Sequence, residues 1–418
     1  MSDASPRACC DEFAAVSRRG LMRGALAMAG TTTILGSAVV RASAAAPTPA
    51  RSVMVVVSMR GAADGLSLVV PHAERAYYDA RPRLAIPSDR LLVKDGQFGL
   101  HPELAPLVPM WLQGKLAAVH ATGLAAPNRS HFAAMEEIED AAPGSSKREG
   151  WLNRLIGTHP TGNPLQGFSY SLGGLPTSLA GPQPVMSGGD LDRVAIPGED
   201  KYDSGGRRRS LKAMWDKNPT ALGRAMRTTF AAVDDFGPVR EGDETPRNAA
   251  MYPDCELGRA LAAVARIIRG DVGVEVLTVD QGDWDHHSDL GTVDWGRMKR
   301  NAGEFAAAVA AFYRDLGLLG DKVTLVTVSE FGRRVRENAN YGLDHGYGNV
   351  MFVAGAGVNG GRYYARWPGL STDHDADLMV TTDYRNVLAE IAQSRFGASS
   401  SAVFPGLVRE QVGVMKGI

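Results

Sequence analysis

The sequence predicts an α/β fold in which a mostly parallel sheet carries helices on both faces. Two apolar runs, residues 53–59 and 323–328, are continuous and rich in β-branched side chains, as strands buried on both sides are. Amphipathic segments at residues 257–269 and 298–319 alternate with such runs. Alternation of this kind is typical of parallel sheets whose strands are joined by helical crossovers.

The remaining elements follow the same order along the chain. Further strands are expected at residues 115–121, 272–279 and 350–354, and further helices at residues 104–111 and 384–396. The helix at 298–319 lies between two strands and has the length of a βαβ crossover. Between residues 150 and 255 the periodicity weakens, so we expect an insertion there within a single domain that spans residues 47–418.

The first 46 residues have the features of an export signal. Ser17-Arg18-Arg19-Gly20-Leu21-Met22 is a twin-arginine signature, followed by an apolar stretch at 25–40 and small residues at 42–46. A membrane anchor is the alternative, but the stretch is diluted by Gly, Thr and Ser and is shorter than the ~20 residues of a spanning helix. We therefore predict recognition by the twin-arginine translocase, a periplasmic or secreted location, and no stable membrane span in the mature chain.

The charge excludes a nucleic-acid-binding protein, and the cysteine content excludes a mature chain held by a disulfide. The formal net charge is −1, so the chain lacks the basic excess of a nucleic-acid-binding protein. Of the three cysteines, Cys9 and Cys10 belong to the predicted leader and only Cys255 remains. An intramolecular disulfide is therefore impossible in the mature chain.

Polar clusters follow four of the predicted strands. In a parallel sheet the carboxyl ends of the strands share one edge, which is where the sites of α/β proteins form. The candidate metal ligands at these ends are Asp64, Asp285, His287, Glu330, Asp344 and His345, and Asn128, Arg129 and Ser130 are the candidate catalytic residues. Carboxylate and imidazole donors suit a divalent ion, Zn²⁺, Mn²⁺, Mg²⁺ or Ca²⁺.

Each candidate has a structural alternative. Asp64 lies between glycine-containing turns and is also placed to cap a helix, as Ser130 is. The segments 285–287 and 344–346 have the composition of surface turns. Glu330 precedes Arg333 closely enough for an ion pair that orders the loop. His131 and His286 have no second argument for a role as ligands, His101 and His120 are expected to be structural, and His374 lies in a segment with the composition of an exposed acidic loop.

The ordered motifs resemble a known family. They are M-R-G-A-A-D-G-L at 59–66, N-R-S-H-F at 128–132, Q-G-D-W-D-H-H at 281–287, S-E-F-G-R at 329–333, D-H-G-Y-G at 344–348 and D-L-M-V-T-T-D-Y-R-N-V-L at 377–388. With the leader, they are similar to those of the exported bacterial domain-of-unknown-function family 1501. This resemblance implies an alkaline phosphatase-like fold, of the alkaline phosphatase/sulfatase superfamily, for the mature domain.

The resemblance also implies roles for individual residues. By motif order Asp64 matches the first acid of that superfamily and Ser130 its nucleophile. Asp285 with His287 matches the spaced pair, and Asp344-His345 matches the Asp-His dipeptide. Tyr347 stands where many members of the look-alike family have His, which implies a site that is reduced to one metal or has lost catalysis.

Two functions follow from this pattern. The first is an exported metal-dependent hydrolase of phosphate or sulfate esters. A metal would activate Ser130 or a water, Arg129 or Arg60 would clamp a small anionic ester, and Asn128 would donate to it. The second is a catalytically silent periplasmic binding or assembly protein on the same fold.

Overall fold

The computed structural model describes residues 33–35, 48–145, 147–171, 174–196 and 205–417. The predicted leader therefore lies outside the described residues, except for Thr33–Leu35, which form strand β1. In the described ranges, no helix has the length and apolarity needed to cross a bilayer.

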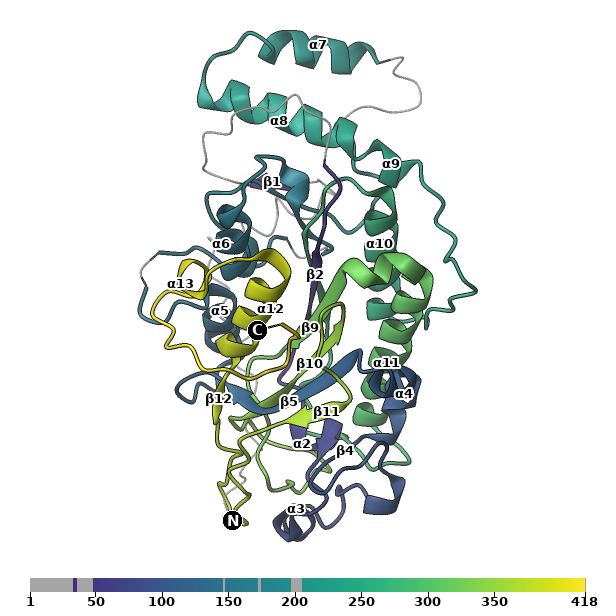
Figure 1. The fold of residues 1–418 in the computed structure, drawn as a ribbon, viewed down its shortest axis with the longest axis vertical. Coiled ribbons are helices and arrows are strands. Elements are labelled where there is room, and N and C mark those ends of the chain that lie inside the picture. The colour runs from purple at the N-terminus through teal and green to yellow at the C-terminus, as the bar shows by residue number, and fades with distance from the viewer. Residues whose placement is uncertain (1–32, 36–47, 146, 172–173, 197–204, 418) are drawn as a thin grey trace, which may run out of the picture.

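One large mixed sheet forms the centre of the molecule (Figure 1). Its strands are β1 (Thr33–Leu35), β2 (Val53–Met59), β5 (Leu116–Gly123), β6 (Gly167–Ser169), β7 (Val185–Ser187), β8 (Val276–Gln281), β9 (Val323–Val328), β10 (Asn349–Gly355), β11 (Arg362–Tyr364) and β12 (Thr382–Asp383). Their order is β1-β7-β6-β8-β2-β9-β10-β5-β11, and β12 pairs with the end of β5. A separate small sheet pairs β3 (Val69–Val70) with β4 (Gly99–Leu100).

The prediction of an α/β fold with a mostly parallel sheet is confirmed, with two exceptions in strand direction: β1 is antiparallel to β7, and β10 is antiparallel to both of its neighbours. β2 pairs in parallel with both β8 and β9. β10 is antiparallel to β9 and to β5. Two reversals restore the direction, so β5 runs parallel to β2, β8 and β9, and the carboxyl ends of these four strands meet at one edge.

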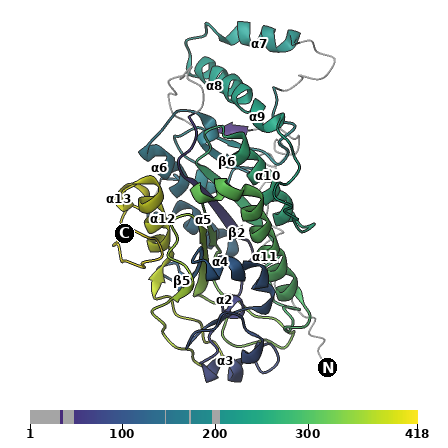
Figure 2. The same ribbon diagram turned by 45° about the vertical axis from the view of Figure 1, so that its right-hand side comes forward.

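Helices cover both faces of the sheet, as predicted (Figures 1 and 2). They are α2 (Gly65–Leu68), α3 (Arg75–Ala80), α4 (Val108–Leu112), α5 (His131–Asp140), α6 (Trp151–Thr158), α7 (Gly206–Trp215), α8 (Ala221–Asp235), α9 (Gly237–Arg240), α10 (Glu256–Gly270), α11 (Arg297–Leu316), α12 (Tyr384–Phe396) and α13 (Ser400–Val403). Helices α10 and α11 pack on one face of the sheet, and α5, α6 and α12 pack on the other.

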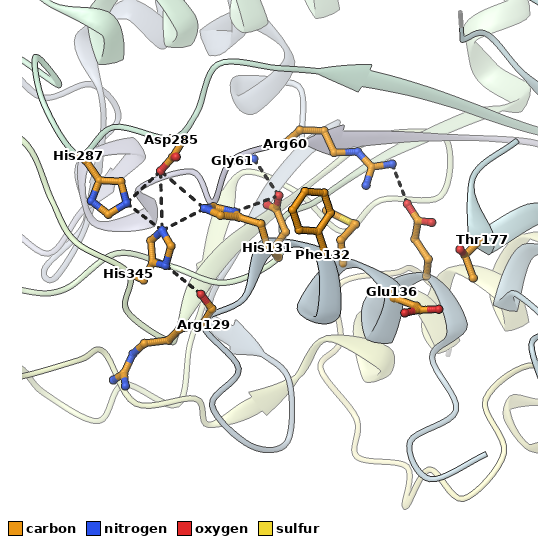
Figure 3. A pocket seen from close by; sticks show the side chains of 13 residues that line it. Arg60, Gly61, Arg129, His131, Phe132, Glu136, Thr177, Asp285, His287 and His345 are labelled. Carbon is orange, nitrogen blue, oxygen red and sulfur yellow. Dashed lines mark hydrogen bonds and ion pairs between the residues drawn. The ribbon is translucent and has the colours of Figure 1, made fainter. Parts of the chain in front are cut away.

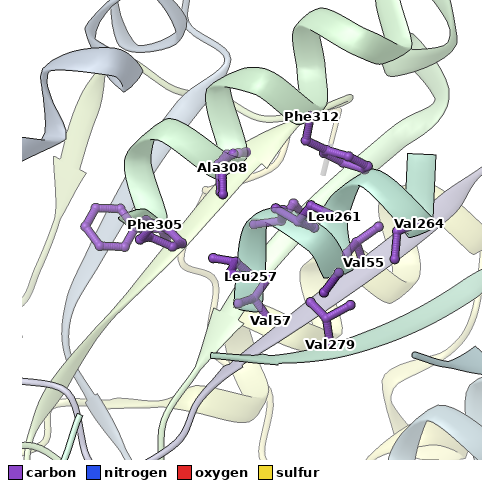
Figure 4. Close-up of a cluster of buried hydrophobic side chains, with 14 of the residues drawn as sticks. Val55, Val57, Leu257, Leu261, Val264, Val279, Phe305, Ala308 and Phe312 are labelled. Atoms are coloured by element: carbon purple, nitrogen blue, oxygen red, sulfur yellow. The ribbon is translucent and has the colours of Figure 1, made fainter. Parts of the chain in front are cut away.

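Alternate residues of β2 explain why both faces are covered. Val55 and Val57 point toward α10 and α11, where Leu261 and Phe312 complete the cluster drawn in Figure 4. Met54 belongs to the cluster on the opposite face. These side chains are fully buried, and each contributes roughly 1.5–3 kcal/mol by leaving water.

The segment expected to be an insertion, residues 150–255, has two parts. Its strands β6 and β7 join the main sheet beside β8. Helices α7 and α8 instead project from the end of the molecule, at the top of Figure 1. The side chains of α7 are not buried, whereas α8 contributes Ala232 to the central core.

Candidate metal centre

Three histidines and one aspartate meet at the shared strand edge (Figure 3). His131 is the first residue of α5, which begins shortly after β5. Asp285 and His287 lie in the turn after β8, and His345 lies in the long loop between β9 and β10. The parallel arrangement of β5, β8 and β9 therefore brings together residues that are far apart in the sequence.

The distances within this group are short. The Nε2 atom of His345 lies 3.0 Å from Nε2 of His131 and 2.9 Å from Nε2 of His287. Oδ1 of Asp285 lies 3.6, 3.3 and 3.8 Å from the Nε2 atoms of His131, His287 and His345. Two ligand atoms bound to one tetrahedral zinc ion at about 2.0–2.1 Å lie roughly 3.3 Å apart. The ligand atoms of His131, Asp285 and His345 all lie within 4.8 Å of one another, so this triad fits a shared ion, and His287 lies beside it against Asp285 and His345.

The other ring nitrogen of each imidazole faces an oxygen acceptor. Nδ1 of His345 donates to the backbone carbonyl of Arg129 at 2.9 Å, and Nδ1 of His287 donates to Oδ1 of Asp344 at 3.1 Å. Nδ1 of His131 lies 3.6 Å from Oε1 of Glu330, an electrostatic contact rather than a hydrogen bond. Metal-binding histidines are usually oriented in this way, by an oxygen acceptor on the nitrogen that does not bind the metal.

These partners fix where the protons lie. A carbonyl and a carboxylate only accept, so Nδ1 carries the proton in neutral His345 and neutral His287. Their Nε2 atoms then present lone pairs to each other at 2.9 Å. Two lone pairs at this distance repel, unless one of the two nitrogens takes up a second proton or a metal ion binds both of them.

The carboxylate of Asp285 is held in place from behind by a buried arginine. Arg333 donates to Oδ1 of Asp285 at 2.7 Å and to the backbone carbonyls of Ala62 and Leu343. Burial alone raises the pKa of Asp285, but its contacts with His131, His345 and Arg333 outweigh this and keep the pKa below its usual range. Asp285 is therefore ionised at neutral pH.

Glu330 supports the cluster from one side. Its carboxylate accepts hydrogen bonds from the backbone amides of Gly61 and Ala62, both at 2.8 Å. Burial by itself lowers the pKa of the His131 imidazole, but the carboxylates of Asp285 and Glu330 outweigh it and raise that pKa to about 9. The expected ion pair between Glu330 and Arg333 is not formed, because Arg333 reaches Asp285 instead.

Asp64 does not join the cluster, contrary to the sequence prediction. It is fully buried, and Arg81 contacts both of its oxygens, at 2.5 and 3.0 Å. It precedes α2 but makes no side-chain capping bond. Its carboxylate is therefore used in an internal ion pair.

The predicted catalytic residues lie beside the cluster and have structural contacts. Oδ1 of Asn128 accepts from the backbone amide of Ser130, and Ser130 is the N-cap residue of α5 without a side-chain capping bond. The guanidinium of Arg129 pairs with Asp377. Ser130 is not among the residues that line the pocket, whereas the neighbouring His131 is.

The cluster lies in a pocket of about 690 Å³. Beyond the cluster, its walls include Arg60, Phe132, Met135 and Glu139. None of these side chains was a predicted ligand, and only Arg60 was named as a possible anion clamp. Tyr347 is buried and its hydroxyl donates to the carbonyl of Leu124 at 2.7 Å, so its contact is structural.

Together these features define an α/β protein with a candidate metal centre at the carboxyl edge of its sheet. The chain matches the model of a family described as "Protein of unknown function (DUF1501)" over residues 99–398. It therefore belongs to the DUF1501 family. No curated protein matched the chain.

Proposed function

We propose that the cluster binds one divalent metal ion through His131, Asp285, His287 and His345. The observation that carries this proposal is the pair of Nε2 lone pairs of His287 and His345, which face each other at 2.9 Å. A proton on His131, whose pKa is raised to about 9, is the competing source of positive charge. That proton would leave the repulsion between His287 and His345 in place.

The donor atoms narrow the choice of metal. Three imidazole nitrogens and one carboxylate oxygen suit Zn²⁺ or another transition ion. Ca²⁺ and Mg²⁺ prefer shells made of oxygen atoms and are less suited to this set. Zn²⁺ is therefore the first candidate among the four ions that the sequence analysis named.

The function that this site supports best is hydrolysis of a phosphate or sulfate ester. A bound metal ion supplies a water of lowered pKa and polarises the ester. In such a hydrolysis the water oxygen would bond to phosphorus or sulfur, the bond from that atom to the alcohol oxygen would break, and the proton released by the water would pass to the alcohol. The pocket has room for the ester, because it extends well beyond the cluster.

The roles of the residues differ from those that the resemblance implied. Ser130 does not line the pocket, so we assign the nucleophile to water and the role of Ser130 to the start of α5. Glu330 and Asp344 orient imidazoles, and Asp64 has no part in the chemistry. The relation to the alkaline phosphatase/sulfatase superfamily remains part of this proposal, supported by the motif order and by the α/β sheet.

Location is a further part of the proposal. The twin-arginine signature at residues 17–22 supports export of the folded chain to the periplasm or beyond. Changing Arg18 and Arg19 together to Lys tests this, with the distribution of the protein between cytoplasm and periplasm as the measurement. Equal export of both forms would refute the assignment.

The hydrolase proposal is tested by metal analysis and by turnover. The purified protein should hold one transition ion per chain and hydrolyse an ester from a panel of phosphate and sulfate esters. His345→Ala should lose both properties. Ser130→Ala should keep both, because the nucleophile is water. No bound metal and no turnover in the wild type would refute the proposal, and loss of turnover in Ser130→Ala with metal retained would restore Ser130 as the nucleophile.

A second candidate, a catalytically silent binding protein, is favoured by one observation. The arginines in the pocket are already paired: Arg60 contacts Asp280 and Glu139, and Arg129 contacts Asp377. No arginine of the pocket is thus left without a carboxylate to clamp an anionic ester. Metal binding without turnover of any ester would support this candidate.

A further inference from the structure

The pocket is elongated along one helix. His131, Met135 and Glu139 all line it, and they stand four residues apart on α5. Residues at this spacing share one face of a helix, and eight residues rise about 12 Å along the axis. The cluster therefore occupies one end of the pocket, and Glu139 marks the other.

The volume of the pocket exceeds what a phosphate or sulfate group needs. It measures about 690 Å³. Pockets of roughly 300–1,000 Å³ hold ligands of drug-like size. The part of the pocket beyond the cluster is therefore available for the body of a larger molecule.

The middle of the pocket is apolar. Phe132 stands between His131 and Arg60 in Figure 3, and it is 63% exposed. Met135 follows it along the same wall. An exposed aromatic ring is a ready contact for an apolar or aromatic group, because such a contact removes apolar surface of both partners from water.

The far end of the pocket is polar. Arg60 bridges Glu139 at 2.7 Å and Asp280 at 3.0 Å, and Glu136 and Thr177 lie on the same part of the wall. Burial, the largest effect, raises the pKa of Glu139, and Arg60 opposes it. This end therefore offers both donors and acceptors to a polar substituent.

We propose that the substrate is an elongated, amphipathic ester. Its reacting group lies at the histidine cluster, its apolar or aromatic body lies along Phe132 and Met135, and its polar end reaches Arg60 and Thr177. The assignment of the reacting group rests on the proposed function. The assignment of the body and the polar end rests on the shape and lining of the pocket.

Two probes of the same head group test the role of the body. Phenylphosphonate and methylphosphonate carry the same anion, and they differ in the apolar group that would lie on Phe132. Isothermal titration of the protein with one equivalent of Zn²⁺ should show phenylphosphonate binding roughly tenfold more tightly. Equal affinity for the two probes, or no binding of either, would overturn the proposal.

A variant of Phe132 tests whether the preference for phenylphosphonate comes from this ring. Phe132→Ala should weaken phenylphosphonate about tenfold and leave methylphosphonate within about twofold, because only the larger probe reaches the ring. Leu112→Ala, which removes another exposed apolar side chain that does not line the pocket, is the matched control and should change neither affinity. An unchanged affinity for phenylphosphonate in Phe132→Ala would overturn the placement of the body.

Binding and turnover separate this proposal from the hydrolase proposal. If the wild type hydrolyses no ester but still prefers phenylphosphonate through Phe132, hydrolysis is refuted and the shape of the ligand stands. If esters are hydrolysed but methyl and aryl esters have equal KM values, hydrolysis stands and the amphipathic ligand is refuted.

Discussion

Two groups of ionisable side chains lie near the carboxyl edge of the sheet, and their hydrogen bonding differs. In the first, Arg81 donates to both oxygens of Asp64, to Ser67 and to the carbonyls of Arg334 and Val335. Both members of this ion pair are fully buried. The second group, His131, Asp285, His287 and His345, is open to the pocket and brings acceptor atoms face to face.

The difference separates a structural ion pair from a candidate binding site. A buried charge is tolerated when its partner and hydrogen bonds are supplied internally, as they are for Asp64 and Arg81. The histidine cluster has no such closed set of internal partners, and its converging nitrogen and oxygen atoms are compatible with a divalent metal ion. The same residue types after a strand therefore have opposite roles, and the hydrogen-bond partners decide which role applies.

The sharpest test of the comparison is removal of one imidazole from the cluster. His287→Ala should lower the affinity for Zn²⁺ about 10³-fold or more, because the ion loses one of its four donors and the remaining three hold it only weakly. Competition with a chelator measures this affinity. The control is His374→Ala, since His374 is 87% exposed and pairs only with Asp375. Equal zinc affinity in His287→Ala and wild type would contradict the assignment.

Breaking the buried ion pair should change stability and leave metal binding intact. Arg81→Met should lower the free energy of unfolding by about 3–5 kcal/mol, because it leaves the Asp64 carboxylate buried and unpaired. Urea unfolding of the metal-free protein measures this change. Arg75→Ala, at an exposed pair with Asp79, should have no measurable effect. A drop below 1 kcal/mol for Arg81→Met would show that the pair is not structural.

A residue that only orients an imidazole should have an intermediate effect. Asp344→Ala removes the acceptor of Nδ1 in His287 and should weaken zinc binding about 10- to 100-fold. Because Asp344 is more than half exposed, the stability of the metal-free protein should change little. Full loss of zinc in this variant would instead identify Asp344 as a ligand.

The smallest expected effect concerns a single histidine with complete internal hydrogen bonding. Nε2 of His120 donates to the carbonyl of Val69, Nδ1 accepts from the amide of Ala121, and burial lowers its pKa to about 4. The unfolded chain binds this proton below a pH of about 6.5, so the free energy of unfolding should fall between about pH 6.5 and 4.

The contribution of His120 should be about 1–2 kcal/mol at pH 5. Urea unfolding at pH 7.5 and 5.0, in wild type and His120→Gln without metal, isolates it as a difference between the two proteins. An equal loss in both would show that His120 does not titrate in this window.

The sequence was informative where a pattern has a single structural meaning. The apolar run at residues 53–59 became β2, and residues 384–396 became α12 with an Asp383 cap. The sequence did not predict strand direction, because the apolar pattern of a buried strand is the same whichever way the strand runs. The run at residues 350–354 became β10, which is antiparallel to β9. The strand β6 is only three residues long and gave no signal.

The candidate site could be predicted only in part, because the sequence gives the position of a residue after a strand but not the direction of its side chain. Asp285, His287 and His345 do converge, because position after a parallel strand places a residue at the shared edge. Whether a side chain then faces the pocket or the core depends on the turn, and Asp64 turned toward Arg81. The sequence predicted Ser130 rather than its neighbour His131 as a site residue, although the position of His131 at the start of a helix after β5 was a signal for it.

The spacing of the histidines along the chain has a consequence for folding kinetics. His131 and His345 are 214 residues apart, and Arg60 and Asp280, at the ends of neighbouring strands, are 220 residues apart. Contacts of such high sequence separation form slowly, because a long stretch of chain must be ordered before they are made. A chain that ends before residue 345 holds only two of the three imidazoles. Assembly of the three-imidazole cluster therefore requires that the chain has been synthesised past residue 345 and that the ends of β5, β8 and β9 have been brought together.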